Sequence, residues 1–98
     1  MKNKVVTICG SMKFEKEMIK IASNLEKEKG WCVIQCVYDI DKNTLTKKEL
    51  NNIVDAHYTK IDISDAIFVI NINGYIGSST QNEIDYATKN GKEIIYLE

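Results

Sequence analysis

The stretch "AIFVINI" (residues 66–72), with "NGYIGSSTQNEIDYA" (residues 73–87) directly after it, decides the expected fold. The first stretch is almost entirely apolar and lacks the alternation of a half-exposed strand, as expected for a strand buried on both faces of a parallel sheet. The second stretch contains "TQNE" (residues 80–83), which matches the S/T-x-x-E capping box, so a helix is expected to begin at Thr80. A buried strand that leads into a helix is typical of an α/β fold.

The remaining chain repeats this pattern of a strand followed by a helix. The predicted strands cover residues 5–9, 31–38, 66–72 and 93–97, and the predicted helices begin near residues 11, 46 and 80. The connections are long enough for right-handed crossovers, which make the strands parallel. The sequence therefore predicts a single domain over residues 1–98 with a three-layer α/β/α, Rossmann-like (flavodoxin-like) fold, in which a four-stranded parallel sheet has the strand order 2-1-3-4.

The composition argues against several classes of protein. Of the 98 residues, 44% are hydrophobic and 28% are charged, and the net charge is −1, as in an ordinary globular chain. The lysines are scattered beside glutamates, which argues against a nucleic-acid polymer as the partner. The N-terminal apolar run is too short for a signal peptide or a membrane span. A domain of this size has a limited core, so we expect a homo-oligomer.

The three cysteines lie inside apolar runs, which indicates free thiols in a reducing cytoplasm. Cys32 and Cys36 would lie about 13 Å apart on one face of a strand. This separation argues against a metal site formed by the pair. We expect neither a metal nor a redox cofactor.

Two loops are expected to meet at the carboxyl end of the sheet. The loop "GSMKF" (residues 10–14) follows the first strand and "NGYIGSST" (residues 73–80) follows the third, and such folds bind ligands between these strands. Glycines, hydroxyls and free N–H groups at a helix start suit a phosphate or a sugar. The candidate ligand-binding residues are Gly10, Ser11, Met12, Lys13, Tyr75, Gly77, Ser78, Ser79 and Thr80. The alternative is that these hydroxyls only cap their helices.

Glu83 has two interpretations. As the last residue of the predicted capping box it could return to the backbone of Thr80. It also borders the apolar side of its helix, where a carboxylate could point into the crevice and attack an anomeric carbon. His57 lies on the apolar stripe of the second helix, where it is either a packed core residue or a general acid or base. The C-terminal half of that helix should approach the amino end of the sheet, which argues against His57 at the crevice. Whether it reaches the crevice stays open, and His57 remains a candidate catalytic residue beside Glu83.

Three segments resemble the nucleoside 2-deoxyribosyltransferase-like superfamily: "ICGSMKF" (residues 8–14), "HYTKIDISDAIFVIN" (residues 57–71) and "GYIGSSTQNEIDYATKNGKEIIYL" (residues 74–97). This superfamily includes deoxyribosyltransferases and deoxynucleoside 5′-monophosphate N-glycosidases. The resemblance implies that Glu83 is the nucleophile and that Gly10 with Ser11 faces the sugar or phosphate. It implies the same contact for the hydroxyls of residues 78–80, and an oligomer in which a neighbouring subunit closes the site.

The chain departs from the transferases in the short segment "DIDKNTL" (residues 39–45), which is longer in many family members and often shapes the base pocket, and at two further places. It has His57 where they carry an aspartate that supports protonation of the base, and "IGSST" (residues 76–80) where they carry Asp-Gly. The resemblance implies an enzyme that cleaves the N-glycosidic bond of a nucleoside or nucleotide, with transfer and hydrolysis both open. The alternatives are a nucleotide-binding or signalling module without turnover, and a structural domain in which Glu83 only caps a helix.

Overall fold

A computed structural model describes residues 3–98. The elements follow one another as β1 (Val5–Gly10), η1 (Met12–Phe14), α1 (Glu15–Lys29), β2 (Cys32–Ile34), α2 (Lys47–Asp62), β3 (Ala66–Ile70), η2 (Ile72–Gly74), α3 (Ser78–Lys89) and β4 (Glu93–Tyr96). The four strands form an all-parallel sheet in the order β2-β1-β3-β4. The predicted α/β class, strand order and parallel pairing are confirmed.

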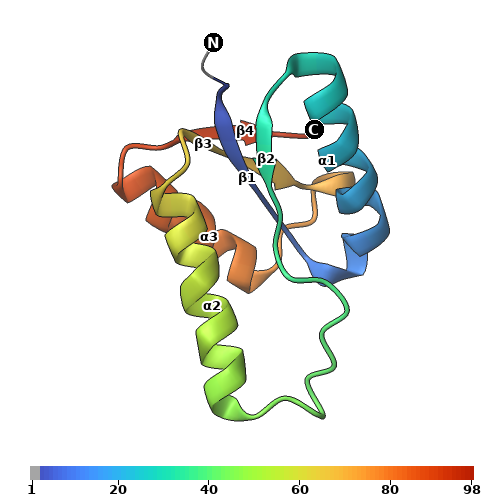
Figure 1. Cartoon of the computed structure of the whole chain (residues 1–98), viewed down its shortest axis with the longest axis vertical. Helices are drawn as coiled ribbons and strands as arrows, with labels where there is room; N and C mark the ends of the chain where they lie inside the picture. Colours follow the sequence, from blue (N-terminus) through green and yellow to red (C-terminus); the bar gives the residue numbers. More distant parts are fainter. Residues whose placement is uncertain (1–2) are drawn as a thin grey trace.

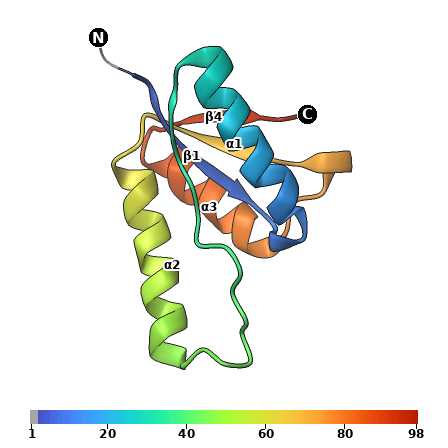
Figure 2. The same ribbon diagram turned by 45° about the vertical axis from the view of Figure 1, so that its right-hand side comes forward.

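Helices cover both faces of the sheet, which gives three layers (Figure 1). Helix α1 packs on one face, while α2 and α3 lie together on the other (Figures 1 and 2). Strand β1 serves both layers because its side chains alternate: Val6 and Ile8 belong to the core under α1, and Cys9 belongs to the core under α2 and α3. Strand β3 is buried along its whole length, as its unbroken apolar run predicts.

The second strand is shorter than predicted. It covers Cys32–Ile34 instead of residues 31–38, and it pairs only with residues 5–7 of β1. Beyond Ile34 the chain leaves the sheet: the Gln35 carbonyl accepts a hydrogen bond from Lys60 Nζ at 2.8 Å, and Asp39 has a φ of 56°. The apolar residues of this segment therefore do not continue the strand, and within residues 3–98 the carboxyl half of β1 has no partner strand on this edge.

Two predicted helix starts are confirmed and the third is wrong. Ser11 Oγ accepts a hydrogen bond from the backbone N–H of Lys13 and caps η1, which leads into α1. Thr46 forms a complete capping box with Glu49 at the start of α2. Helix α3, however, begins at Ser78 with Gly77 as its N-cap and no side-chain cap. The "TQNE" pattern thus lies inside the helix, and Glu83 does not cap it.

Within residues 3–98, no helix combines the length and the apolar character that crossing a membrane requires.

Gly10 is required by close packing at the end of β1. A Cβ atom at this position would lie 3.0 Å from Ile70 Cβ and 3.2 Å from Met18 Sδ. We expect Gly10→Ala to lower the free energy of unfolding by about 1–3 kcal/mol, the usual cost of overpacking a core. Urea denaturation of the parent and the variant measures this difference. An unchanged free energy of unfolding would contradict the close packing.

Candidate functional site

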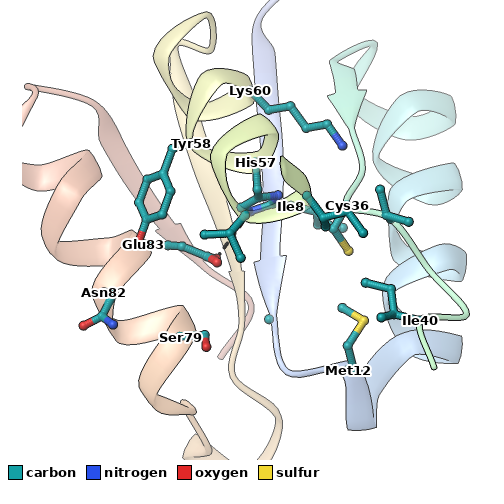
Figure 3. Close-up of a pocket in the computed structure, with 14 residues that line it drawn as sticks. Ile8, Met12, Cys36, Ile40, His57, Tyr58, Lys60, Ser79, Asn82 and Glu83 are labelled. Atoms are coloured by element: carbon teal, nitrogen blue, oxygen red, sulfur yellow. Dashed lines mark ion pairs between the residues drawn. The ribbon is translucent and has the colours of Figure 1, made fainter. Parts of the chain in front are cut away.

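A cavity of about 220 Å³ lies at the carboxyl end of the sheet, between α2, the first turns of α3 and the segment that follows β2. One side of the cavity is apolar and includes Met12 and Ile40 (Figure 3). The other side is polar, because Ser79, Asn82 and Glu83 come from the same side of α3 (Figure 3). An apolar lining with a few placed polar groups is typical of a site for a small organic ligand.

Glu83 borders this cavity and contacts two buried side chains from other elements. His57 Nε2, on α2, lies 3.4 Å from Glu83 Oε1, and the same nitrogen forms a hydrogen bond with Cys9 Sγ, on β1, at 3.5 Å. The side chains of His57 and Glu83 are only 11% and 17% exposed, and Cys9 is 1% exposed. His57 and Glu83 form part of the cavity wall (Figure 3), and Cys9 lies behind them in the core.

The surroundings of Cys9 favour its neutral thiol. Burial, and next the charge of the Glu83 carboxylate, raise the pKa of Cys9 well above its usual value. Burial and then Glu83 also raise the pKa of Tyr58, which lines the cavity. A buried thiol with a raised pKa is a poor nucleophile. Glu83 is therefore the better candidate for chemistry in this cluster.

His57 has one buried nitrogen without a hydrogen-bond partner among the described residues, and this atom is Nδ1. A bare N–H buried without an acceptor is costly. We therefore infer that a neutral His57 carries its proton on Nε2, where it faces Cys9 Sγ and Glu83 Oε1. The ring then orients the carboxylate.

His57 lines the crevice, a position that the sequence left open. The C-terminal half of α2 does approach the amino half of β1, since Thr7 Oγ1 donates to the Lys60 carbonyl at 3.1 Å. But β1 has only six residues. One helical turn before Lys60, His57 already lies beside Cys9 near the end of the strand. The N-terminal turns of α2 extend past the sheet (Figures 1 and 2).

The start of α3 explains the position of Glu83. The helix begins at Ser78 and therefore already includes Ser79. Within the helix, Ser79 and Glu83 are four residues apart and lie on one side, with Asn82 beside them. All three line the cavity. Thr80 points elsewhere and is 2% exposed. A helix that began at Thr80 would place Glu83 in its first turn instead of its second.

The predicted site residues fall into two groups. Five of them line the cavity: Gly10, Met12, His57, Ser79 and Glu83. The others are not among the lining residues: Ser11, Lys13, Tyr75, Gly77, Ser78 and Thr80. In this second group, Lys13 Nζ lies 3.4 Å from the centre of the Tyr75 ring, and the Tyr75 ring meets Phe14 edge-on. These contacts hold the two loops together beside the cavity.

Other lining residues were not singled out in the sequence. Ile53, Val54 and Tyr58 belong to the apolar stripe of the second helix, and Asn82 is a polar residue next to Glu83, so none of the four has a sequence pattern typical of a ligand site. The length of the second helix indicates that some of its apolar residues lie outside the core. A helix of 16 residues spans about 24 Å, whereas β1 has six residues. Part of the apolar stripe must therefore extend beyond the sheet.

One cluster has a spacing that could hold a metal ion. Within residues 3–98, Cys9, His57 and Glu83 each offer a ligand atom, and these atoms all lie within 4.8 Å of one another. The cysteine of this cluster is Cys9 and not the pair Cys32 and Cys36.

No family model matches this chain, and a search of the curated proteins finds no match. The geometry and chemistry of the cavity are therefore the grounds for assigning a function.

Because Glu83 does not cap α3, its loss should not weaken the helix. We expect Glu83→Gln to melt at the parent temperature or above it, since active-site carboxylates often lower stability. Thr46→Ala is the matched control because it removes a genuine capping box, at a cost of about 1 kcal/mol or about 4–8 °C in Tm. Differential scanning fluorimetry compares the two variants. If Glu83→Gln loses as much as Thr46→Ala, Glu83 has a structural role.

Proposed function

We propose that this protein cleaves the N-glycosidic bond of a nucleoside or nucleotide and that Glu83 is the nucleophile. The observation that carries this proposal is the position of the Glu83 carboxylate. It borders a cavity at the carboxyl end of a parallel sheet, is mostly buried, and has no capping role. A carboxylate so placed can attack an anomeric carbon and form a covalent glycosyl intermediate.

The two sides of the cavity suit the two parts of a nucleoside. The apolar side, with Ile40, Ile53 and Val54, can pack against the flat face of a base. The Ser79 hydroxyl and the Asn82 amide, on the side of Glu83, can form hydrogen bonds with a sugar.

The start of α3 also favours a substrate that carries a phosphate group. Its N-cap, Gly77, offers no side chain to the first N–H groups of the helix, and the first turn has no acidic residue. Free N–H groups and the helix dipole favour an anion at such a position. A 5′-monophosphate would place its charge there while the sugar lies beside Glu83.

The proposed reaction has two steps. A Glu83 oxygen bonds to C1′ as the bond from C1′ to the base nitrogen breaks, and the electron pair leaves with the base, which takes up a proton. Water or a second base then attacks C1′, and the ester bond to Glu83 breaks. Hydrolysis and transfer differ only in which acceptor enters.

His57 is proposed to position Glu83. Its burial and its contacts with Cys9 and Glu83 support this role. Water in the cavity then supplies the proton for the leaving base.

Release of free base tests the function. The parent protein is incubated with a panel of deoxynucleosides, ribonucleosides and their 5′-monophosphates, and free base is measured by chromatography. We expect release from at least one compound, and a loss of at least about 1,000-fold in Glu83→Gln because the nucleophile is removed. Asp85→Asn is the matched control, since Asp85 is exposed on the same helix and pairs with Gln81.

Three results would contradict the proposal. Binding without release of base from any compound would favour the nucleotide-binding module, and neither binding nor release would favour the structural domain. Release at the parent rate by Glu83→Gln would exclude Glu83 as the nucleophile.

We also propose that a second copy of the chain closes the open side of the cavity, in a reducing cytoplasm that keeps the three thiols free. Three apolar cavity residues are exposed: Met12 at 40%, Val37 at 43% and Val54 at 45%. Burial of such side chains between subunits would be favourable.

Light scattering tests this assembly. We expect a dimer or larger oligomer for the parent and a shift towards monomer for Val54→Lys, because a charge would be buried at the contact. Lys48→Ala is the control, since Lys48 is exposed on the same helix and does not line the cavity. A monomeric parent would contradict the proposal.

A further inference from the structure

The cluster of Cys9, His57 and Glu83 combines three kinds of metal ligand in one place: a thiol sulfur, an imidazole nitrogen and a carboxylate oxygen. They come from β1, α2 and α3, so the fold itself brings them together. Thiolate and imidazole ligands favour Zn²⁺ and related transition metals over Mg²⁺ or Ca²⁺.

Two of the three separations between these atoms match a tetrahedral ion, and the third, between Cys9 Sγ and the Glu83 carboxylate, is within 4.8 Å. Bond lengths of about 2.3 Å to sulfur and about 2.0–2.1 Å to nitrogen and oxygen place neighbouring ligands about 3.3–3.6 Å apart in a tetrahedron. His57 Nε2 lies 3.5 Å from Cys9 Sγ and 3.4 Å from Glu83 Oε1. Both separations from His57 Nε2 therefore already suit an ion bound through this nitrogen.

The surroundings leave room for a fourth ligand. His57 and Glu83 line the cavity, so one side of the cluster faces space that a water molecule or a ligand atom can enter. Three protein ligands and one open position are typical of an accessible zinc site, whereas closed structural sites use four protein ligands.

We propose that Cys9, His57 and Glu83 bind a zinc-class divalent cation through Sγ, Nε2 and a carboxylate oxygen. On binding, the Cys9 thiol transfers its proton to solvent and forms a bond from sulfur to the metal. The metal is not consumed and no electron is transferred.

The site is expected to bind its metal reversibly. With Nε2 on the metal, the ring proton moves to Nδ1, which has no hydrogen-bond partner among the described residues. Metal-binding histidines normally donate this N–H to a partner, and loss of such a partner weakens binding by about 10–100-fold. The occupancy can therefore follow the metal concentration.

The cation would inhibit the enzyme, and this consequence rests on the proposed function of Glu83. A carboxylate bound to a metal cannot attack C1′. Metal and substrate then compete for one side chain, so the metal acts as a regulator of the same cavity.

Cobalt spectroscopy tests the site without any enzymatic assay. The metal-free parent protein is titrated with Co²⁺, and we expect saturation at one ion per chain, with a charge-transfer band from sulfur to cobalt and the intense visible bands of tetrahedral Co²⁺. Added Zn²⁺ should displace the cobalt and remove these bands. A titration without a sulfur band would overturn the proposal.

Variants identify the ligands. The double variant Cys32→Ser/Cys36→Ser keeps Cys9 as the sole cysteine and should retain the bands, whereas Cys9→Ser should lose the sulfur band. A sulfur-to-cobalt band that survives in Cys9→Ser, or that vanishes in the double variant, would overturn the proposal. Glu83→Gln retains Cys9 and should weaken Co²⁺ binding at least about tenfold, so the test holds even if Cys9→Ser does not fold. Undiminished binding by Glu83→Gln would exclude this ligand set.

Inhibition of the enzyme by the metal is tested separately from metal binding. Where the parent releases base, Zn²⁺ should suppress the release and EDTA should restore it. Activity that is unaffected at a Zn²⁺ concentration that saturates the cobalt-binding site would overturn inhibition. If no base is released from any substrate but the cobalt bands appear, the proposed function fails and the metal site stands.

Discussion

The parallel pairing of β1 with β3 determines where the other parts of this molecule lie. Residues 6–10 of β1 lie opposite residues 66–70 of β3, so the two strands end at the same edge of the sheet. Gly10 at the end of β1 lies against Ile70 at the end of β3, with no space for a Cβ atom. This close contact brings the loops that follow the strands together, and with them the start of α3.

The cluster of Cys9, His57 and Glu83 lies beside this edge. Apolar residues could supply the same packing for folding. A carboxylate, an imidazole and a thiol lie together in a mostly buried position, and one imidazole nitrogen has no partner among the described residues. Apolar side chains would fill this space without such desolvation costs. Polar groups retained at a cost beside a cavity are typical of functional sites.

Most of the fold could be predicted because its determinants are local. The apolar run of β3 and the helix start at Thr46 each act through neighbouring residues, and each occurs as predicted. The failures depend on contacts between distant residues. The sequence 31–38 has the composition of a strand, but only residues 32–34 pair with β1.

The candidate site was less predictable for the same reason. The "TQNE" pattern is a valid capping box by itself, yet the chain enters α3 two residues earlier, at Ser78. Likewise, the distance of His57 from the crevice depends on the length of β1 relative to α2, which no local pattern contains. Glu83 was a candidate from its place at the edge of the apolar stripe, but its contacts with Cys9 and His57 could not be inferred from spacing.

Because β2 ends early, binding of a ligand would add to the stability of the fold. Because the chain leaves the sheet after Ile34 and the first turns of α2 extend past the sheet, apolar side chains such as Ile40, Ile53 and Val54 line a cavity. A bound molecule would take the place of the missing interior contacts. Binding and unfolding are then linked by mass action, and a ligand present at 100 times its Kd adds about 2.7 kcal/mol to stability. In a chain of 98 residues, a bound ligand would therefore extend the hydrophobic core.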